Sequence, residues 1–382
     1  MPKPHLLIFI EHYQPGYKFG GPIQSVANLV SLLKHHYLIS IVTRDRDYGD
    51  ATPYVGIPTD EWLAKDGYRI RYLSPAGASF GGIRALLTEE RYDYVYTNSL
   101  FAPFTRQLLL LALLTGQRIV IAPRGELHPG ALALKRYKKQ PFVWLTRLLP
   151  KNRIVWHATD WEEVRAIQQH FGSGRVRYAP VRFAPDTPNR LPQRTEHRKR
   201  TGEARLIFMS RITPKKGLRF LLERLIQHTG GRIVLDIFGP IVDERYWQEC
   251  EGLLTRMPAT CVVCYRGAVQ HQQVNEIVKN YDFFALPTLG ENFGHAIFEA
   301  LSAGLPVLIS DQTPWRNLTA QRAGWDLPLV ESAWANALTQ AVAMNGATYA
   351  QWSVPARAVA DAYLRTGQFE QTYVDLFSPA HD

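Results

Sequence analysis

The sequence is poor in cysteine and has no long apolar run, and we expect no export signal. Three cysteines among 382 residues exclude a disulfide framework. The leucine-rich run 108–114 is far shorter than the roughly 20 apolar residues that a membrane-spanning helix needs. The apolar start of the chain carries Glu11 and His12 and has no small-residue cleavage site, so we expect a first strand and a cytoplasmic location.

Two short patterns imitate metal or redox sites. Cys261 and Cys264 have C-x-x-C spacing, but residues 261–265 read as a strand, which places the two side chains on opposite faces. Asp45 and Asp47 flank Arg46, which supplies a compensating charge, and no further ligand is grouped with them. We therefore expect a polar loop at 45–47 and no metal site.

Positive charge is concentrated in the first half of the chain. Residues 1–180 contain 23 Lys or Arg and 14 Asp or Glu, a balance of +9, whereas residues 181–382 contain 21 and 20, a balance of +1. The segment 135–153 places basic residues beside large apolar ones, which suits an anionic membrane surface. An amphipathic helix packed on the core shows the same pattern. No nucleic-acid-binding motif accompanies the charge, so no nucleic-acid partner is expected.

Short apolar strands alternate with helical stretches along the chain, which predicts parallel sheets covered by helices on both faces. Residues 186–203 are charged and proline-rich and interrupt this alternation as a linker. We expect an α/β chain with an N-terminal Rossmann-like domain over 1–185 and a second over 204–360. The remaining residues, 361–382, form a C-terminal helix.

The polar loops fall at the carboxyl ends of the predicted strands, where doubly wound sheets bind ligands. Gly20 and Gly21 follow the first strand, and Arg124 follows the strand 118–122. In the second domain, Arg211 and Lys216 lie between a strand and a helix start. Two cations at a helix N-terminus suit a diphosphate.

The segment 286–310 combines two glutamates with a strand, a loop and a helix. Glu291 lies in the loop after the strand 281–286, and Glu299 lies in the helix 294–303. The backbone N–H groups of Phe293, Gly294 and His295 would point out of the helix N-terminus, which attracts anions.

This segment resembles the Glu-x7-Glu motif of retaining glycosyltransferases with the GT-B fold, in particular family 4. Residues 208–217 resemble the phosphate-clamp segment of that family, and 19–33 resemble its N-terminal Gly-Gly loop and helix. Residues 122–126 and 310–316 resemble segments of bacterial members that build surface polysaccharides. The resemblance implies two doubly wound Rossmann-like domains facing across a cleft, with the last helices crossing back to the first domain.

The resemblance also implies a reaction and its site. A sugar would move from a nucleotide-diphosphate sugar to a glycan or lipid-linked acceptor, with retention and without a metal. Glu291 would contact the donor sugar and Glu299 the ribose, while backbone near Arg266 would contact the base. The implied site comprises Glu291, Arg211, Lys216, Arg124 and His128 for catalysis, and Gly20, Gly21, Arg266, Asn292, Phe293, Gly294, His295 and Glu299 for donor binding.

The chain departs from the family at one place. Many members carry a histidine before a glycine near the reacting sugar, where this chain has Arg124 before Gly125. Arginine stays protonated and cannot act as a base. Arg124 could act electrostatically, or His128 or Glu126 in the same loop could take the role.

Three alternatives remain open at this level. A sugar phosphorylase on the same fold would use the clamp for inorganic phosphate, and a binding module would hold the nucleotide sugar without turnover. Ser79 lies in a formal G-x-S-x-G pattern typical of hydrolases, but that pattern needs a serine directly after a strand. Ser79 reads more simply as part of a loop of small residues.

Overall fold

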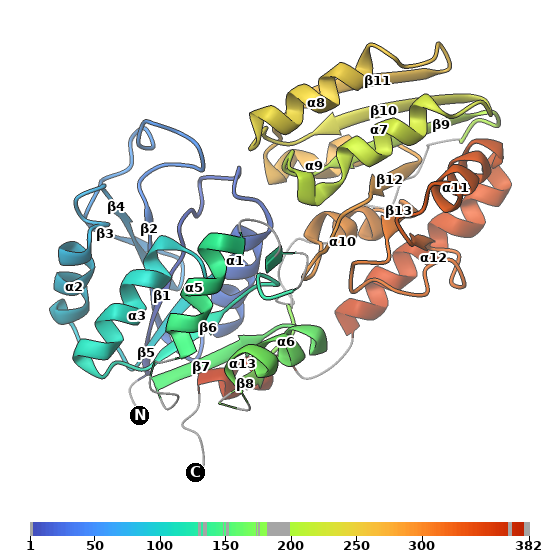
Figure 1. The fold of residues 1–382 in the computed structure, drawn as a ribbon. Helices are drawn as coiled ribbons and strands as arrows, with labels where there is room; N and C mark the ends of the chain where they lie inside the picture. The colour runs from blue at the N-terminus through green and yellow to red at the C-terminus, as the bar shows by residue number, and fades with distance from the viewer. Residues whose placement is uncertain are drawn as a thin grey trace. The chain divides into compact units, whose positions relative to one another are not determined.

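The computed structural model describes residues 3–128, 131–132, 136–147, 149, 153–172, 174, 176–181, 199–365 and 369–377. The chain divides into two compact units (Figure 1). Unit 1 comprises Met1–Thr187 and Gly367–Asp382, and unit 2 comprises Pro188–Thr366. Most of the predicted linker 186–203 lies outside the described residues.

Unit 1 is built on an eight-stranded sheet with the order β3-β4-β2-β1-β5-β6-β7-β8. Among these strands, β3 pairs antiparallel with β4 and the other pairings are parallel. The strands are β1 His5–Phe9, β2 Leu38–Arg44, β3 Trp62–Lys65, β4 Tyr68–Leu73, β5 Tyr94–Asn98, β6 Ile119–Ala122, β7 Ile154–Ala158 and β8 Val176–Tyr178.

Helices cover both faces of this sheet, and alternate residues of each strand serve the two cores. Leu7 and Phe9 of β1 join one core, whereas Leu6 and Ile8 join the other. The first core includes residues of α2 (Phe80–Glu89), α3 (Pro103–Thr115), α5 (Arg136–Arg147) and α6 (Trp161–Phe171). The second includes residues of α1 (Gly21–Leu33) and α13 (Phe369–Phe377).

The last described helix, α13, belongs to unit 1 although it follows unit 2 in the sequence. Phe377 is buried, and its ring centroid lies 5.6 Å from that of Tyr37, 5.7 Å from that of Tyr94 and 6.0 Å from that of Tyr96. Such edge-on aromatic contacts add to the burial energy of the rings. They fix α13 beside β5.

Unit 2 is built on a six-stranded parallel sheet with the order β11-β10-β9-β12-β13-β14. Its strands are β9 Glu203–Met209, β10 Arg232–Phe238, β11 Cys261–Gly267, β12 Phe283–Leu286, β13 Val307–Ser310 and β14 Gly324–Leu327. Its helices are η2 Pro214–Lys216, α7 Leu218–Ile226, α8 Glu244–Leu254, α9 His271–Val278, α10 His295–Ser302, α11 Glu331–Ala343 and α12 Gly346–Arg365.

The predicted fold class of two doubly wound α/β domains is confirmed. The sequence reading missed β3, β8 and β14, which are short and lie at sheet edges, where hydrophobic patterning is weak. Within the described ranges, none of the helices combines the length and hydropathy of a membrane-spanning helix.

Candidate active site

The strongest contact among the predicted residues joins Lys216 and Glu291 in unit 2. Lys216 Nζ lies 2.5 Å from Glu291 Oε1, and the two side chains are only 14% and 11% exposed. The Thr288 hydroxyl donates to the same carboxylate oxygen at 2.9 Å. Burial alone would raise the pKa of Glu291, but the charges of Lys216 and Lys215 outweigh it and hold that pKa below its usual value. Glu291 is therefore an ionised carboxylate in a largely enclosed place.

The two loops that carry this pair are held together by backbone. The N–H of Leu289 donates to the carbonyl oxygen of Lys215 at 2.7 Å. Gly217 follows Lys216 with φ of +72°, and a Cβ there would lie 1.9 Å from the carbonyl oxygen of Pro287. Only glycine allows both this φ and this close approach. The glycine of the sequence motif thus permits the contact between the two loops.

The start of α10 is built from aromatic packing. Gly294 precedes the helix in the left-handed conformation, with φ of +81° and ψ of +64°. Phe293 is buried, and its carbonyl oxygen accepts from Trp315 Nε1 at 2.6 Å. The His295 ring packs edge-on against Phe293 at 4.9 Å. The Phe293 side chain is thus part of the core, and a ligand could meet this segment through the helix N-terminus.

Glu299 does not meet the Lys216–Glu291 pair in any described contact. It lies in α10, 17% exposed, with Oε1 3.3 Å from Nδ1 of His271 at the start of α9. Burial raises the pKa of Glu299 to about 8 and lowers the pKa of His271. At neutral pH the carboxyl is thus favoured in its protonated form, in which it can donate to the imidazole.

The other predicted residues of unit 2 lie around these contacts. Arg211 follows β9, and Asn292 follows Glu291 in the loop before α10. Arg266 is half-exposed, and its Nε donates to Asp236 Oδ1 at 2.8 Å. Tyr281 donates to the second oxygen of Asp236 at 2.7 Å. The guanidinium of Arg266 is therefore engaged at Nε within the unit.

In unit 1, Gly20 ends the loop between β1 and α1, and Gly21 is the first residue of α1. Gly20 has φ of +73°, and α1 begins at Gly21 with Pro22 in its first turn. The ring of Phe19, directly before them, lies 5.2 Å from that of His12 and 5.8 Å from that of Tyr48. This loop is closed by Asp47, which accepts from the N–H of Tyr17 at 2.8 Å and that of Lys18 at 3.1 Å.

Arg124 lies after β6, with a positive φ of +54°. Its Nε donates to Asn98 Oδ1 at 2.9 Å, and its Nη2 donates to the hydroxyl of Tyr96 at 2.9 Å. Tyr96 and Asn98 belong to β5, the neighbouring strand. The guanidinium is thus held against the carboxyl end of the sheet, the position that the sequence predicted for a ligand site.

Glu126 and His128, the alternatives to Arg124, differ from each other. Glu126 accepts from the hydroxyl of Ser99 at 2.6 Å and from the backbone N–H groups of Leu100 and Phe101, and burial raises its pKa. Both of its oxygens thus take part in holding the loop after β5 to the loop after β6, which indicates a structural role. His128 Nδ1 lies 3.9 Å from Glu162 Oε2, and its Nε2 is buried without a partner among the described residues.

The remaining sequence patterns have structural explanations. Ser79 caps α2 by accepting from the N–H of Gly82 at 3.2 Å, and Asp45 pairs with Arg46 at 2.8 Å. Cys261 is buried and Cys264 is half-buried along β11. Over the described part of the chain, no group of three or more His, Cys, Asp or Glu side chains could hold a metal ion.

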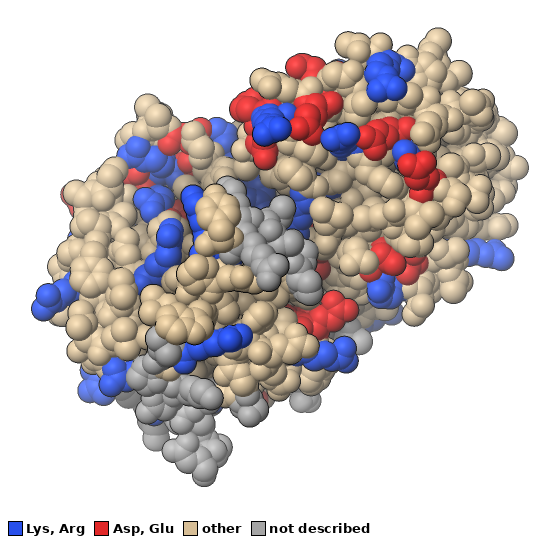
Figure 2. Space-filling model, viewed as in Figure 1, with Lys and Arg blue, Asp and Glu red and all other residues tan. Residues whose placement is uncertain are grey.

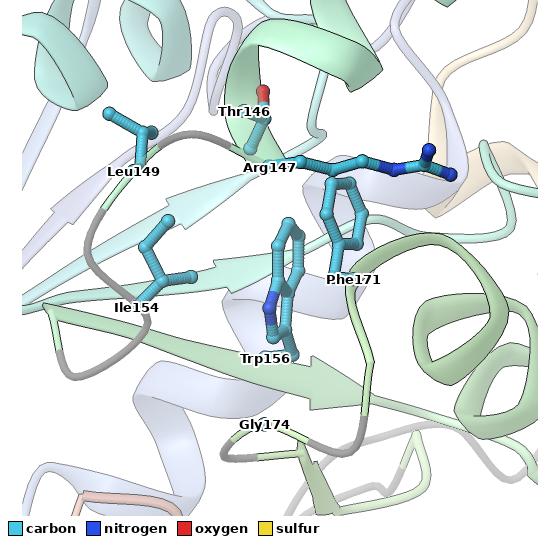
Figure 3. A pocket seen from close by; sticks show the side chains of 7 residues that line it. All are labelled: Thr146, Arg147, Leu149, Ile154, Trp156, Phe171 and Gly174. Atoms are coloured by element: carbon cyan, nitrogen blue, oxygen red, sulfur yellow. The ribbon is translucent and has the colours of Figure 1, made fainter.

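A cavity of about 20 Å³ in unit 1 contains none of the predicted residues (Figure 3). It has room for about one water molecule. The rings of Trp156 and Phe171 stack beside it with centroids 4.3 Å apart. Its lining consists of Thr146, Arg147, Leu149, Ile154, Trp156, Phe171 and Gly174.

Four residues at these places were not predicted from the sequence: Thr288, His271, Tyr96 and Asn98. Thr288 lies in the same loop as Glu291, so its polar side chain was the available signal. His271 is 28 residues from Glu299 in the chain, and Asn98 is 26 residues from Arg124. Only the packing of separate elements brings these pairs together.

Residues 189–341 match the family model described as glycosyl transferases group 1. The chain is 31% identical over 124 residues to the GtfA subunit of a UDP-N-acetylglucosamine–peptide N-acetylglucosaminyltransferase from Streptococcus parasanguinis, covering 32% of this chain and 23% of the relative. It is 30% identical over 103 residues to sulfoquinovosyl transferase SQD2 of Arabidopsis thaliana, covering 27% and 18%. The chain thus spans less than a quarter of these relatives.

Solved structures of similar fold cover almost the whole chain. Sucrose-phosphate synthase of Thermosynechococcus elongatus superposes with a TM-score of 0.73 at 16% identity, covering 98% of this chain and 97% of that one. Anabaena HepE, solved with UDP and glucose, gives 0.69 at 16% identity, and WaaG, a glycosyltransferase involved in lipopolysaccharide biosynthesis, gives 0.67 at 14%. Both cover 97% of this chain and 98% of their own. Residues 189–341 therefore match the glycosyl transferases group 1 family, and the chain has the GT-B fold of two Rossmann-like domains.

Proposed function

We propose that this chain is a family 4 glycosyltransferase that moves a sugar from a nucleotide-diphosphate sugar to an acceptor hydroxyl with retention of the anomeric configuration. The buried Lys216–Glu291 ion pair carries the proposal. It lies inside the matched region 189–341, at the carboxyl ends of parallel strands. One protein with the same fold, Anabaena HepE, has been solved both with UDP and glucose and with UDP-glucose, which favours a nucleotide sugar as donor.

In the proposed reaction, the bond between sugar C1 and the diphosphate oxygen breaks, and a bond from C1 to the acceptor oxygen forms on the same face. The proton of the acceptor hydroxyl passes to the leaving phosphate. Lys216 and Arg211 stabilise the negative charge on that phosphate, together with the N-terminus of α10. Glu291 accepts from hydroxyls of the sugar, and Glu299 from hydroxyls of the ribose.

The proposed reaction needs no metal ion, because fixed cations take that role. Lys216 is held in place by Glu291 at 2.5 Å, so its charge is already positioned when the donor arrives. A preorganised charge in a water-poor site stabilises a leaving group without reorganisation. Activity should therefore persist in the presence of a chelator.

We propose a glycan or lipid-linked acceptor, in the synthesis of cell-surface polysaccharide, with unit 1 seated on an anionic membrane. On α5, Tyr137, Trp144 and Leu145 are 73%, 59% and 52% exposed, and α3 exposes Leu114 at 71%. Neither helix contains an acidic residue. Figure 2 shows Lys and Arg side chains spread among uncharged ones on unit 1. Parts of the predicted basic segment 135–153 lie outside the described residues.

The proposal is tested by incubating the purified chain with UDP-, GDP- and ADP-sugars in the presence of a chelator, and by measuring the nucleoside diphosphate released. Thermal unfolding identifies the base first, since a ligand at about 100 times its Kd adds roughly 2.7 kcal/mol to stability. Proton NMR of the product then gives the anomeric configuration. If no nucleoside diphosphate raises the unfolding temperature, the clamp is not a nucleotide site and the proposal is wrong.

A further inference from the structure

Three buried nitrogen atoms without hydrogen-bond partners among the described residues lie at the ends of two neighbouring strands of unit 1. They are Nδ2 of Asn98, the last residue of β5, and Nη1 of Arg124 and Nε2 of His128 in the loop after β6. Buried polar atoms are nearly always partnered, because a donor or acceptor that is removed from water without a hydrogen bond destabilises the fold. Other buried polar atoms of the described residues also lack partners, but Asn98 and Arg124 stand out because their side chains are hydrogen-bonded to each other and each still has an unused donor.

The orientation of the Asn98 amide follows from its neighbour. Arg124 can only donate, so the Asn98 atom that faces Arg124 Nε at 2.9 Å must be the carbonyl oxygen. The amide nitrogen Nδ2 is therefore the end that has no partner. Asn98 is only 2% exposed, so bulk water does not compensate for the missing bond. The Asn98 and Arg124 side chains are hydrogen-bonded to each other, and each has one donor without an acceptor: Asn98 Nδ2 and Arg124 Nη1.

A chain of hydrogen bonds behind Arg124 fixes its guanidinium. His157 Nε2 lies 2.7 Å from the carbonyl oxygen of Ala179, so Nε2 carries the proton and Nδ1 is the acceptor. The Tyr96 hydroxyl, 3.0 Å from that Nδ1, must then donate to it and accept from Arg124 Nη2. Burial, together with the charge of Arg124, lowers the pKa of His157 to about 3, which keeps the imidazole neutral.

The contacts of the Arg124 side chain provide no anion. Both are neutral oxygens, the Asn98 amide and the Tyr96 hydroxyl. Glu163 influences the pKa of Arg124 but uses its two oxygens on the N–H of Gly125 and on Thr159. A guanidinium with a buried Nη1 and no hydrogen-bonded counter-ion is costly, and an anionic ligand would remove that cost.

We propose that Asn98 and Arg124 form a receptor for one phosphate oxygen of a substrate, with Tyr96 and His157 as the positioning residues behind it. This inference rests on the proposed function. The phosphate belongs either to a phosphate-linked acceptor or to the nucleotide-sugar donor. In either case Asn98 Nδ2 and Arg124 Nη1 donate to an oxyanion, which is the strong, charge-assisted kind of hydrogen bond.

The test uses the whole chain, the Asn98→Asp variant and inorganic pyrophosphate as the probe. The new carboxylate pairs with Arg124 and repels an anion, so the unfolding temperature should not fall while pyrophosphate binding weakens by tenfold or more. Asn345→Asp is the matched control, because it makes the same charge change at an exposed residue of unit 2. Calorimetric titrations measure pyrophosphate with and without saturating UDP.

The titrations distinguish the two sources of the phosphate. If pyrophosphate binds beside UDP and only this binding is lost in Asn98→Asp, the receptor serves the acceptor. If Asn98→Asp instead loses UDP affinity, it serves the donor. Unchanged affinities for both ligands in a folded Asn98→Asp variant would overturn the inference. A failure of the proposed function gives a different result. The wild-type chain would then transfer no sugar, but Asn98→Asp would still bind pyrophosphate more weakly than the wild type does.

Tyr96→Phe tests the positioning role, because it removes one hydroxyl and keeps the ring packed against Phe377. We expect weaker binding of the same phosphate, by about 1 kcal/mol or roughly fivefold, from the loss of one hydrogen bond to Arg124. His157→Gln, which retains a donor and an acceptor, should recover part of the affinity that His157→Leu loses. Equal affinity in both His157 variants would contradict a positioning role.

Discussion

The loop after β12 in unit 2 and the loop after β6 in unit 1 both follow the carboxyl end of a strand in a mainly parallel sheet, yet their charged side chains are paired in opposite ways. In unit 2, Lys216 and Glu291 neutralise each other at 2.5 Å. In unit 1, Arg124 is bonded to neutral oxygens, and neighbouring donors remain without acceptors. Lys216 must give up part of its contact with Glu291 when it binds the donor. The unused donors of Asn98 and Arg124 can instead form new hydrogen bonds to a ligand without breaking existing ones.

The two glutamates of unit 2 repeat this contrast within one segment. Glu291 has a cation in contact, and its pKa is lowered. Glu299, eight residues later, is buried beside an imidazole whose own pKa is lowered, and its pKa rises to about 8. Burial acts on both carboxyls, and the presence or absence of a fixed cation decides the direction. The same residue type therefore enters the proposed reaction in two protonation states.

The largest expected effect comes from Lys216→Ala, which breaks the neutral pair. Turnover should fall by about 10²–10³, because a positioned donor to the leaving phosphate is lost. The variant also leaves the Glu291 carboxylate buried without its cation, so the unfolding temperature should fall. Steady-state release of nucleoside diphosphate and thermal unfolding measure the two effects.

Arg219→Ala is the control for Lys216→Ala. Arg219 lies three residues later, but its ion pairs with Glu223 and Glu249 are on the surface, so little should change. Glu291→Gln should restore much of the stability of Lys216→Ala without restoring turnover. Wild-type turnover in Lys216→Ala would contradict the role of this lysine.

The second effect concerns the backbone that holds the pair. Gly217→Ala places a methyl group against the Pro287 carbonyl and forces φ of +72° on alanine. Gly202→Ala is the matched control, with φ of +82° and open space around the new atom, and should cost about 1–2 kcal/mol of unfolding free energy. Gly217→Ala should cost more than the control and should also lower turnover. Urea unfolding compares the two, and equal costs would show that the loops do not need this close approach.

The sequence predicted much of this architecture because the signals were local. The strand-to-helix alternation, the glycines at Gly217 and Gly294, and the cations after β9 are each visible within one segment. Parallel topology then places the ends of the strands at one edge, so Lys216 and Glu291 could be expected near each other although 75 residues separate them.

What could not be predicted depends on side chains from separate elements. The family resemblance indicated Arg124 as a replacement for histidine, but its bonds to Asn98 and Tyr96 arise only when β5 and β6 pair. Glu126 was the third candidate in the sequence, after Arg124 and His128, and only the folded loop shows that Ser99, Leu100 and Phe101 donate to its oxygens. Sequence spacing contains no information about which of two nearby polar side chains turns inward.

The third effect is a pH dependence of stability, which tests whether Glu299 differs from Glu291 in its protonation state. Glu299 has a folded pKa of about 8, above its ordinary value of 4.5, so the folded state holds a proton that the unfolded state releases. The stability of the wild-type chain should therefore fall as pH rises from about 4.5 to about 8. Glu299→Gln has no carboxyl to titrate, so its stability should not fall in this way. The unfolding temperature of the variant should therefore rise relative to that of the wild type as pH increases over that range.

Glu251→Gln, at an exposed position of α8, provides the control and should show no such growth. Unfolding temperatures of all three proteins between pH 5 and pH 9 give the comparison. A constant difference between Glu299→Gln and the wild type would mean that the Glu299 carboxyl titrates normally. Nucleotide binding should weaken in the same variant, because the amide of Gln has an NH2 group in place of one carboxyl oxygen and so offers fewer acceptors to the ribose hydroxyls.

The smallest expected effect tests whether the charge difference between the units has a function. Residues 1–180 have a balance of +9 against +1 for the rest of the chain, and exposed Trp144 and Leu145 lie on α5, a helix without acidic residues. Replacing both by Ser should weaken binding to vesicles with anionic lipid by about tenfold, since the two partly buried apolar side chains together contribute roughly 1.4 kcal/mol. Val354→Ser in unit 2, at a residue 64% exposed, should leave binding unchanged.

Cosedimentation with neutral vesicles separates insertion of apolar side chains from attraction between charges, because attraction between charges gives no binding to neutral vesicles. If the wild type binds neither kind of vesicle, the basic surface of unit 1 serves a soluble acceptor, and the contrast between the units is one of substrate rather than of location.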